Sequence, residues 1–263
     1  MHFKRLLIAF ILLPVLYCYV MFLPPEYFLL LMTFFSTVGL AEFYAMYKLK
    51  GLFMYSGLFW GALLLIASFA VPDLFLQILL FAALATMALR LFLKRDPESS
   101  ISAVSAAVFG LIYLPGLISF QLSIVKTGPS WIILLYTSVW AADSMALYVG
   151  KTIGKRKLYP EISPNKTIEG AAGSVLGGIV GTAFIKWTLL SHITLTQAAI
   201  IGLAIGFSTI VGDLVESMFK RDAGVKDSSH LLPGHGGVLD KLDGVTFAGP
   251  VFYWVCLGLG LIR

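Results

Sequence analysis

Charged side chains are scarce in this 263-residue sequence, in which 13% of the residues are Asp, Glu, Lys or Arg and 59% are hydrophobic. A typical soluble domain carries roughly 25% charged residues, and its interior could not take up this much apolar surface. The composition therefore excludes an ordinary soluble domain. It predicts an all-α, polytopic membrane protein with no separate soluble domain between its apolar segments.

Cysteine and histidine are also few, with two and four residues. Cys18 and Cys256 both lie in apolar runs, as small buried hydrophobic residues do, and they say little about the redox compartment. The sequence contains no basic, aromatic surface module, so no nucleic acid is expected as a partner. The net charge of +5 instead fits basic loops that flank a membrane.

The long apolar runs predict about nine transmembrane helices of about 20 residues each. The first follows two basic residues but has no cleavage site after it, so we expect it to be a retained helix rather than a signal peptide. The predicted spans are 6–23, 27–47, 52–71, 74–93, 101–123, 130–150, 170–190, 195–219 and 244–262.

The basic residues predict the orientation of these spans. With the N-terminus in the cytoplasm, only Lys126, Lys186 and Arg263 of the 19 Lys and Arg residues would lie on the outer side. Basic residues gather in cytoplasmic loops. The pattern therefore predicts an odd number of spans, with the N-terminus inside and the C-terminus outside.

The polar residues divide the chain into two predicted parts. Residues 1–125 read as transmembrane scaffold, in which Glu42 and Arg90 lie late in their spans. For both residues, an ion pair that stabilises the fold, or a side chain that reaches to the membrane–water interface, is favoured over a functional role. Pro115 is expected to kink its helix. Residues 126–263 carry the chemistry.

Small residues in the second part predict close helix packing. Glycines recur at a spacing of four in the seventh span and again in the eighth, and such ridges let membrane helices approach closely. The packing would hold a polar site rigid between the sixth, seventh and eighth spans. The glycines are Gly173, Gly177, Gly181, Gly202 and Gly206.

A polar stripe follows the eighth span. Thr209, Asp213, Glu216, Ser217 and Lys220 are separated by steps of three and four residues, which places them on one face of a helix. Such a face lines a cavity or another polar surface rather than lipid.

Two carboxylates are expected at similar depth in neighbouring helices. Asp213 precedes Lys220 by seven residues, or about 10 Å, and Asp143 precedes Lys151 by eight, or about 12 Å. The pair predicts a cation site. A secondary transporter or channel that uses Asp143, Asp213 and Glu216 as an intramembrane relay remains the alternative from another class.

The basic loop after the sixth span is a second candidate feature. Ser163 followed by Pro164 is typical of a helix start, and a helix N-terminus near Lys166 suits phosphate. The loop is not a Walker A sequence, so P-loop chemistry is not indicated. Taken alone, a basic loop more often marks topology than a ligand site.

The loop after the eighth span combines cations, glycines and acids. Carboxylate ligands with few histidines favour Mg²⁺ over zinc, and Mg²⁺ among lysines and glycines suits a nucleoside triphosphate. His235 could act as a general base or hold the loop. The other residues of this loop are Lys220, Arg221, Lys226, Asp227, Gly234, Gly236, Gly237, Asp240, Lys241 and Asp243.

These two loops resemble the signatures of the phosphatidate cytidylyltransferases, or CDP-diacylglycerol synthases. The likeness covers roughly the C-terminal half, whereas the N-terminal half matches only as apolar spans. Two departures are Lys241, where the family commonly has arginine, and Tyr148, one position later than the family's aromatic. The matching runs are Ser217-x-x-Lys220-Arg221-x4-Lys226-Asp227, Pro233-x-His235-Gly236-Gly237-x-x-Asp240-x-x-Asp243 and Asp143…Gly150-Lys151…Ser163-Pro164-x-Lys166-Thr167-x-Glu169-Gly170.

The resemblance implies an integral-membrane nucleotidyltransferase that makes CDP-diacylglycerol and diphosphate from CTP and phosphatidate. We expect Asp213 and Asp240 to bind Mg²⁺ directly. Asp143 and Asp243 are expected either to be further ligands or to contact the ligands without binding the ion. A second cation and a homodimer are left open, as is another CTP-dependent lipid enzyme. We expect a plasma-membrane protein whose site faces the cytoplasm.

The remaining roles are expectations from the same resemblance. Lys220 and Arg221 are expected to be catalytic, holding phosphatidate or the departing diphosphate together with Lys226. Other substrate-binding candidates are Ser163, Lys166, Thr167, Glu169, Ser217, Asp227, His235, Gly236, Gly237 and Lys241.

Overall fold

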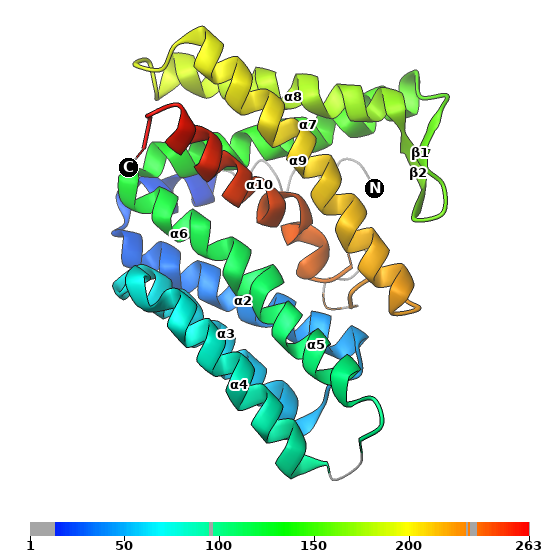
Figure 1. Cartoon of the computed structure of the whole chain (residues 1–263). Helices are drawn as coiled ribbons and strands as arrows, with labels where there is room; N and C mark the ends of the chain where they lie inside the picture. Colours follow the sequence, from blue (N-terminus) through cyan, green and yellow to red (C-terminus); the bar gives the residue numbers. More distant parts are fainter. Residues whose placement is uncertain (1–13, 95–96, 230, 232–235, 263) are drawn as a thin grey trace.

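The computed structural model describes residues 14–94, 97–229, 231 and 236–262, and nearly all of its regular structure is helical (Figure 1). Residues 14–22 are helical ahead of the first labelled element. In chain order the elements are α2 Pro25–Met46, α3 Gly51–Ala70, η1 Pro72–Leu74, α4 Phe75–Leu93, α5 Ser100–Leu111, η2 Ile112–Gly116, α6 Leu117–Thr127, α7 Pro129–Thr152, β1 Lys157–Tyr159, β2 Ser163–Thr167, α8 Ile168–Thr188, α9 Leu195–Asp222 and α10 Leu239–Gly258.

Seven segments of the described chain are long and apolar enough to cross a membrane. They match the second to eighth predicted spans, which are confirmed as apolar helices, and they make this a multi-pass membrane protein. The first predicted span begins outside the described residues. The ninth coincides with α10, which is helical but not among the seven, so the total of nine and the orientation stay predictions. The seven are Pro25–Met46, Gly51–Ala70, Pro72–Leu93, Ser100–Thr127, Pro129–Thr152, Ile168–Thr188 and Leu195–Asp222.

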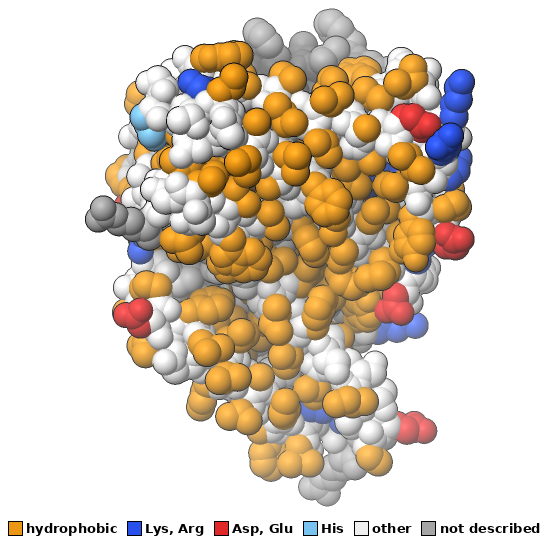
Figure 2. Space-filling view, turned by 45° about the horizontal axis from the view of Figure 1, so that its top comes forward, with side chains coloured by type: hydrophobic (Ala, Val, Ile, Leu, Met, Phe, Trp, Pro, Cys, Tyr) orange, Lys and Arg blue, Asp and Glu red, His pale blue; other side chains and the backbone are white. Residues whose placement is uncertain are grey.

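The outer surface is unusually apolar. Figure 2 shows a face on which hydrophobic side chains dominate, with charged side chains gathered toward its edges. Phe34, Phe59, Leu91 and Trp187 are each more than 60% exposed. Because water would penalise such large bare side chains, this surface suits a lipid environment.

Glycines bring α7, α8 and α9 into close contact. A Cβ atom on Gly177 would lie 2.4 Å from the carbonyl oxygen of Ala141 on α7. On the next position of α8, a Cβ on Gly178 would lie 2.3 Å from the carbonyl oxygen of Gly202 on α9. No side chain fits at either contact, so the predicted close packing of these three helices is confirmed.

Pro115 marks an irregular turn within the fifth predicted span. It lies in η2, a single π-helical turn that joins α5 to α6. Proline has no N–H to donate, so regular α-helical hydrogen bonding cannot continue through this position.

The loop before α8 differs from the expectation. Ser163 and Pro164 do not start a helix; they begin β2, which pairs with β1 as an antiparallel hairpin. Helix α8 starts at Ile168, because the Thr167 hydroxyl accepts the Gly170 N–H at 3.1 Å and caps the helix one residue earlier.

Candidate active site

Helices α9 and α10 touch at Gly212, beside the polar stripe. A Cβ on Gly212 would lie 2.6 Å from the carbonyl oxygen of Asp243 and 2.8 Å from the Cβ of Phe247. Only glycine fits this contact. The close approach brings Asp213, the next residue on α9, to the first turns of α10.

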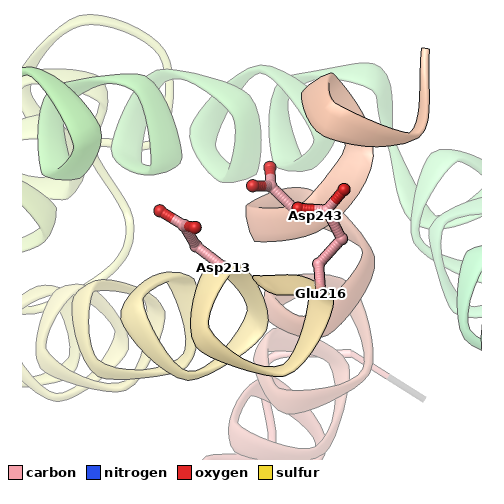
Figure 3. A group of neighbouring side chains, drawn as sticks. All are labelled: Asp213, Glu216 and Asp243. Atoms are coloured by element: carbon pink, nitrogen blue, oxygen red, sulfur yellow. The ribbon is translucent and has the colours of Figure 1, made fainter. Parts of the chain in front are cut away.

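Three carboxylates meet where the two helices approach. Asp213 and Glu216 project from α9 and Asp243 from α10 (Figure 3), and each offers an oxygen within 4.8 Å of the others. Glu216 is buried, with 1% of its surface exposed, whereas Asp213 and Asp243 are partly exposed. The cluster is thus open on one side and enclosed on the other.

The hairpin adds a cation to this cluster. The ammonium group of Lys166, on β2, forms an ion pair with the Asp213 carboxylate, which also accepts a hydrogen bond from Ser217 at 3.4 Å. The hairpin is tied to the end of α9, because the Arg221 guanidinium donates to the Ile162 carbonyl oxygen at 3.3 Å.

Lys220 connects the cluster to Asp240. Its ammonium nitrogen lies 2.7 Å from a Glu216 oxygen and 2.6 Å from Asp240 Oδ1. The ammonium group bridges the two carboxylates and fixes the distance between them.

Asp240 is held by the loop between α9 and α10. Its Oδ2 accepts the Ser228 hydroxyl at 2.8 Å, the Ser228 N–H at 3.2 Å and the Gly237 N–H at 2.7 Å. Together with Lys220 these donors favour the ionised carboxylate. Asp240 is therefore firmly oriented beside the three-acid cluster, but it does not belong to the cluster.

Asp143 reaches the same region from α7. It is exposed, and one of its oxygens lies 3.9 Å from the position of a Cβ on Gly244, the residue after Asp243. The structure thus brings Asp143, Asp213 and Asp243 into one acidic region.

Two predicted substrate-binding residues already have partners within the protein. The Thr167 hydroxyl caps α8, and the Glu169 carboxylate accepts the backbone N–H of Lys155 at 3.0 Å and that of Arg156 at 3.2 Å. Both side chains shape the turn between the hairpin and α7. Their direct contact with substrate stays a prediction.

The other predicted site residues differ in how exposed they are. Gly237 is buried, Ser163, Lys166, Ser217 and Gly236 are partly exposed, and Arg221, Lys226, Asp227 and Lys241 are exposed. His235 lies outside the described residues. Tyr148, whose position departs from the family pattern, is 57% exposed.

Two groups in the region were not assigned to the site from sequence. From sequence, Glu216 lies on the predicted stripe and has a role only in the alternative transporter mechanism. The sequence does not single out Ser228. A spacing of three residues from Asp213 was a usable signal for Glu216, whereas nothing local distinguishes Ser228 from other loop serines.

The acidic cluster fits a metal ion. Glu216 Oε1 has no hydrogen-bond donor among the described residues, and Glu216 Oε2 is contacted by the Lys220 ammonium group. Buried oxygens without donors are ready acceptors for a cation, and an all-carboxylate donor set suits a hard divalent ion. Asp213, Glu216 and Asp243 can therefore hold such an ion.

The chain matches the profile of the Cytidylyltransferase family over residues 3–258. It is 34% identical over 278 residues to the phosphatidate cytidylyltransferase of Haemophilus influenzae, an alignment that covers 95% of this chain and 96% of the relative. It is 34% identical over 233 residues to that of Bacillus subtilis, covering 84% and 85%. With the phosphatidate cytidylyltransferase of Synechocystis sp. it shares 44% identity over 142 residues, covering 52% of this chain and 47% of the relative.

Proposed function

Because the chain belongs to the cytidylyltransferase family, we propose that it makes CDP-diacylglycerol and diphosphate from CTP and phosphatidate within a membrane. Relatives named phosphatidate cytidylyltransferase that align along nearly the whole chain support this substrate pair. The observation that carries the proposal is the acidic cluster flanked by Lys166 and Lys220 at the meeting point of the helices.

The reaction needs no nucleophile from the protein. A phosphate oxygen of phosphatidate forms a new bond to the α-phosphorus of CTP, and the bond from that phosphorus to the bridging oxygen breaks, so diphosphate leaves with the electron pair. The second pKa of a phosphomonoester is about 6, so the phosphate of phosphatidate is largely dianionic at neutral pH. The enzyme's task is to bring two polyanions together and hold them in line.

Mg²⁺ is the proposed cofactor. Asp213, Glu216 and Asp243 would hold it, with Asp143 at the open side and Asp240 beside the cluster, and a second cation is compatible with this many acids. When bound, Mg²⁺ neutralises phosphate charge and favours departure of diphosphate. Hard oxygen ligands support this choice of ion over zinc.

The basic residues have different proposed roles. Lys166 approaches Asp213 from the hairpin, where its ammonium group can contact the CTP phosphates. Arg221 and Lys226 lie exposed at the end of α9, where they can contact phosphatidate or the departing diphosphate. Lys220 is enclosed between Glu216 and Asp240, so its contribution is to hold those carboxylates in register beside the reacting phosphates.

We further propose a plasma-membrane location with the site facing the cytoplasm, where CTP is available. The gathering of basic residues at one set of loops supports this orientation. A homodimer stays a prediction, which crosslinking in native membranes would check.

The direct test is release of diphosphate from labelled CTP by the purified protein in lipid vesicles. Release should require both phosphatidate and Mg²⁺, and the lipid product should carry the label of the cytidine ring. Vesicles with diacylglycerol in place of phosphatidate are the control. Turnover that uses diacylglycerol and yields CDP would instead identify a lipid kinase. Vectorial ion uptake without CTP turnover would identify a transporter.

A further inference from the structure

Glu42 makes contacts that a scaffold residue does not need. It lies in α2, it is 6% exposed, and it is the single charged residue in the apolar run 27–47. Its partners come from the distant loop that leads into α10. The residues that donate hydrogen bonds to its carboxylate are Ser228, Ser229, Val238 and Leu239.

Glu42 supplies the N-terminal cap of α10. Leu239 is the first residue of that helix, and the segment before it provides no side-chain cap. The Leu239 N–H donates to Glu42 Oε2 at 2.8 Å and the Val238 N–H to Oε1 at 3.0 Å. A carboxylate at this position satisfies unpaired N–H groups and complements the helix dipole. Glu42 thereby fixes where α10 begins, one residue before Asp240.

The contact extends from Glu42 to the acidic cluster through Ser228. The Ser228 hydroxyl oxygen lies 3.1 Å from Glu42 Oε2 and 2.8 Å from Asp240 Oδ2. A hydroxyl has one proton, so it donates to one of these carboxylates at a time. Asp240 in turn binds Lys220, which binds Glu216. A continuous polar connection therefore runs from α2 to the cluster.

Two glycines allow the backbone to pack closely against this polar connection. A Cβ on Gly237 would lie 2.1 Å from the Ser228 hydroxyl oxygen and 2.4 Å from Glu42 Oε2. Gly236 has a φ of +81°, in the left-handed region that favours glycine, and a Cβ there would lie 2.5 Å from Asp240 Oδ2. The backbone is wrapped closely around the carboxylates of Glu42 and Asp240.

Phe43 on α2 and Tyr47, the residue after α2, hold the other end of the same loop. The Tyr47 hydroxyl donates to Asp222, the last residue of α9, at 2.9 Å, and the Phe43 ring meets the Phe219 ring edge-on at 6.1 Å between centroids. The end of α2 thus holds both the exit from α9 and the entry to α10.

We propose that Glu42 is a positioning residue for the reaction. By capping α10 and sharing Ser228 with Asp240, it sets the placement of Asp240 and Lys220 relative to Glu216 and the bound phosphates. This inference rests on the proposed function, and it gives the N-terminal half of the chain a part in the active site. Glu42 itself touches no substrate.

The test compares Glu42→Gln with wild type in the vesicle assay. Glutamine keeps the size and one acceptor oxygen, but its NH₂ group cannot accept the N–H and O–H donors that meet the second oxygen. We expect kcat to fall by about 10- to 100-fold, with little change in KM for CTP. This range is typical for residues that hydrogen-bond to metal ligands and orient them. Glu42→Asp keeps two acceptor oxygens and should retain more activity than Glu42→Gln.

Matched variants separate positioning from general stability. Ser228→Ala removes the group shared with Asp240 and should lower kcat. Ser229→Ala removes bonds to Glu42 and to the Leu231 N–H but none to Asp240, and should lower kcat less. The losses from Ser228→Ala and Glu42→Gln should not multiply in the double variant, because both break one connection. Glu26→Gln, at the exposed first turn of α2, should leave activity unchanged.

Wild-type kcat in Glu42→Gln would overturn the inference, as would a loss explained wholly by less folded protein or a lower Tm. Either result leaves the proposed function intact as long as wild type converts CTP and phosphatidate. Absence of that conversion in wild type would remove the proposed function itself.

Discussion

At the scale of single residues, the site depends on carboxylates that share a small volume. Each of Asp213, Glu216 and Asp243 would repel the others unless cations lie nearby. Lys166 and Lys220 supply part of this compensation, and a divalent ion would supply the rest. The charges of these residues are therefore interdependent.

Replacing Asp213 with Asn should abolish turnover and leave folded protein in the membrane. The amide keeps the shape of the side chain but removes a negative charge that a divalent ion requires. The loss of activity should therefore exceed the roughly 10- to 100-fold loss that is typical when a residue that only orients a metal ligand is replaced. Glu216→Gln should raise the Mg²⁺ concentration needed for half-maximal rate. Diphosphate release at a series of Mg²⁺ concentrations measures both effects.

The same titration tests the role predicted for Asp240. If Asp240 binds the ion, Asp240→Asn will shift the Mg²⁺ requirement; if it acts through Lys220, the rate will fall at every concentration. Asp73→Asn, on an exposed turn remote in sequence from the loops of the site, is the control and should match wild type. Near-normal activity from both Asp213→Asn and Asp240→Asn would remove the metal-ligand assignment.

Sequence reasoning found part of this site and missed part for a definable reason. Asp243 lies in a motif that carries the resemblance, and the stripe spacing places Asp213 and Glu216 on one face of a helix. The importance of Glu42 does not follow from its neighbours in sequence, because its partners lie 186 to 197 residues away. Local patterns predict the face of a helix, but they do not predict which distant loop that face meets.

At the scale of elements, the site depends on how closely α9 approaches α10. Replacing Gly212 with Ala would place a methyl group 2.6 Å from the Asp243 carbonyl oxygen. Overpacking of this kind costs roughly 1–3 kcal/mol, and the helices must shift to relieve it. We expect a higher Mg²⁺ requirement and a lower rate, because the shift separates Asp213 from Asp243.

Gly258→Ala is the matched control for this prediction. Gly258 ends α10, and a Cβ there would meet nothing within 4 Å. Its activity and Tm should equal those of wild type. Equal Mg²⁺ requirements for Gly212→Ala and Gly258→Ala would show that the contact does not set the cluster's geometry.

The hairpin is the second element with a predicted part in catalysis. Lys166→Met removes the ammonium group beside Asp213 and should raise KM for CTP by about tenfold or more, since a charge-assisted hydrogen bond contributes roughly 1.5–3 kcal/mol. Lys157→Met changes an exposed lysine on β1 of the same hairpin and is the control. Initial rates over a range of CTP concentrations give both values. An unchanged KM in Lys166→Met would argue against contact with the nucleotide.

The elements themselves differ in how well the sequence predicts them. Seven spans follow directly from apolar length, since a helix must satisfy its own backbone in lipid. The hairpin does not follow, because residues 157–167 are mostly polar, contain Pro160 and Pro164, and show no alternation of apolar residues. Its form depends on Thr167 and Glu169, whose bonds become visible only in three dimensions.

At the scale of the whole molecule, contacts gather the functional loops at one end of the helices. Tyr47 at the end of α2 binds Asp222 at the end of α9, and Arg221 binds Ile162 in the hairpin. Figure 1 shows the hairpin and the end of α9 away from the C-terminus and the turn between α8 and α9. We predict that this end faces the cytoplasm, because basic residues gather in cytoplasmic loops.

Cysteine labelling in intact cells can test this orientation. With Cys18 and Cys256 replaced, Lys157→Cys places a thiol on the hairpin, and Ser191→Cys places one on the exposed turn between α8 and α9. A membrane-impermeant maleimide should label Ser191→Cys in intact cells and Lys157→Cys only after the cells are opened, because basic loops face the cytoplasm. Diphosphate release by each variant confirms that the labelled protein is folded. The opposite labelling pattern would place the hairpin, and with it Lys166 and the acidic cluster, on the side that lacks CTP.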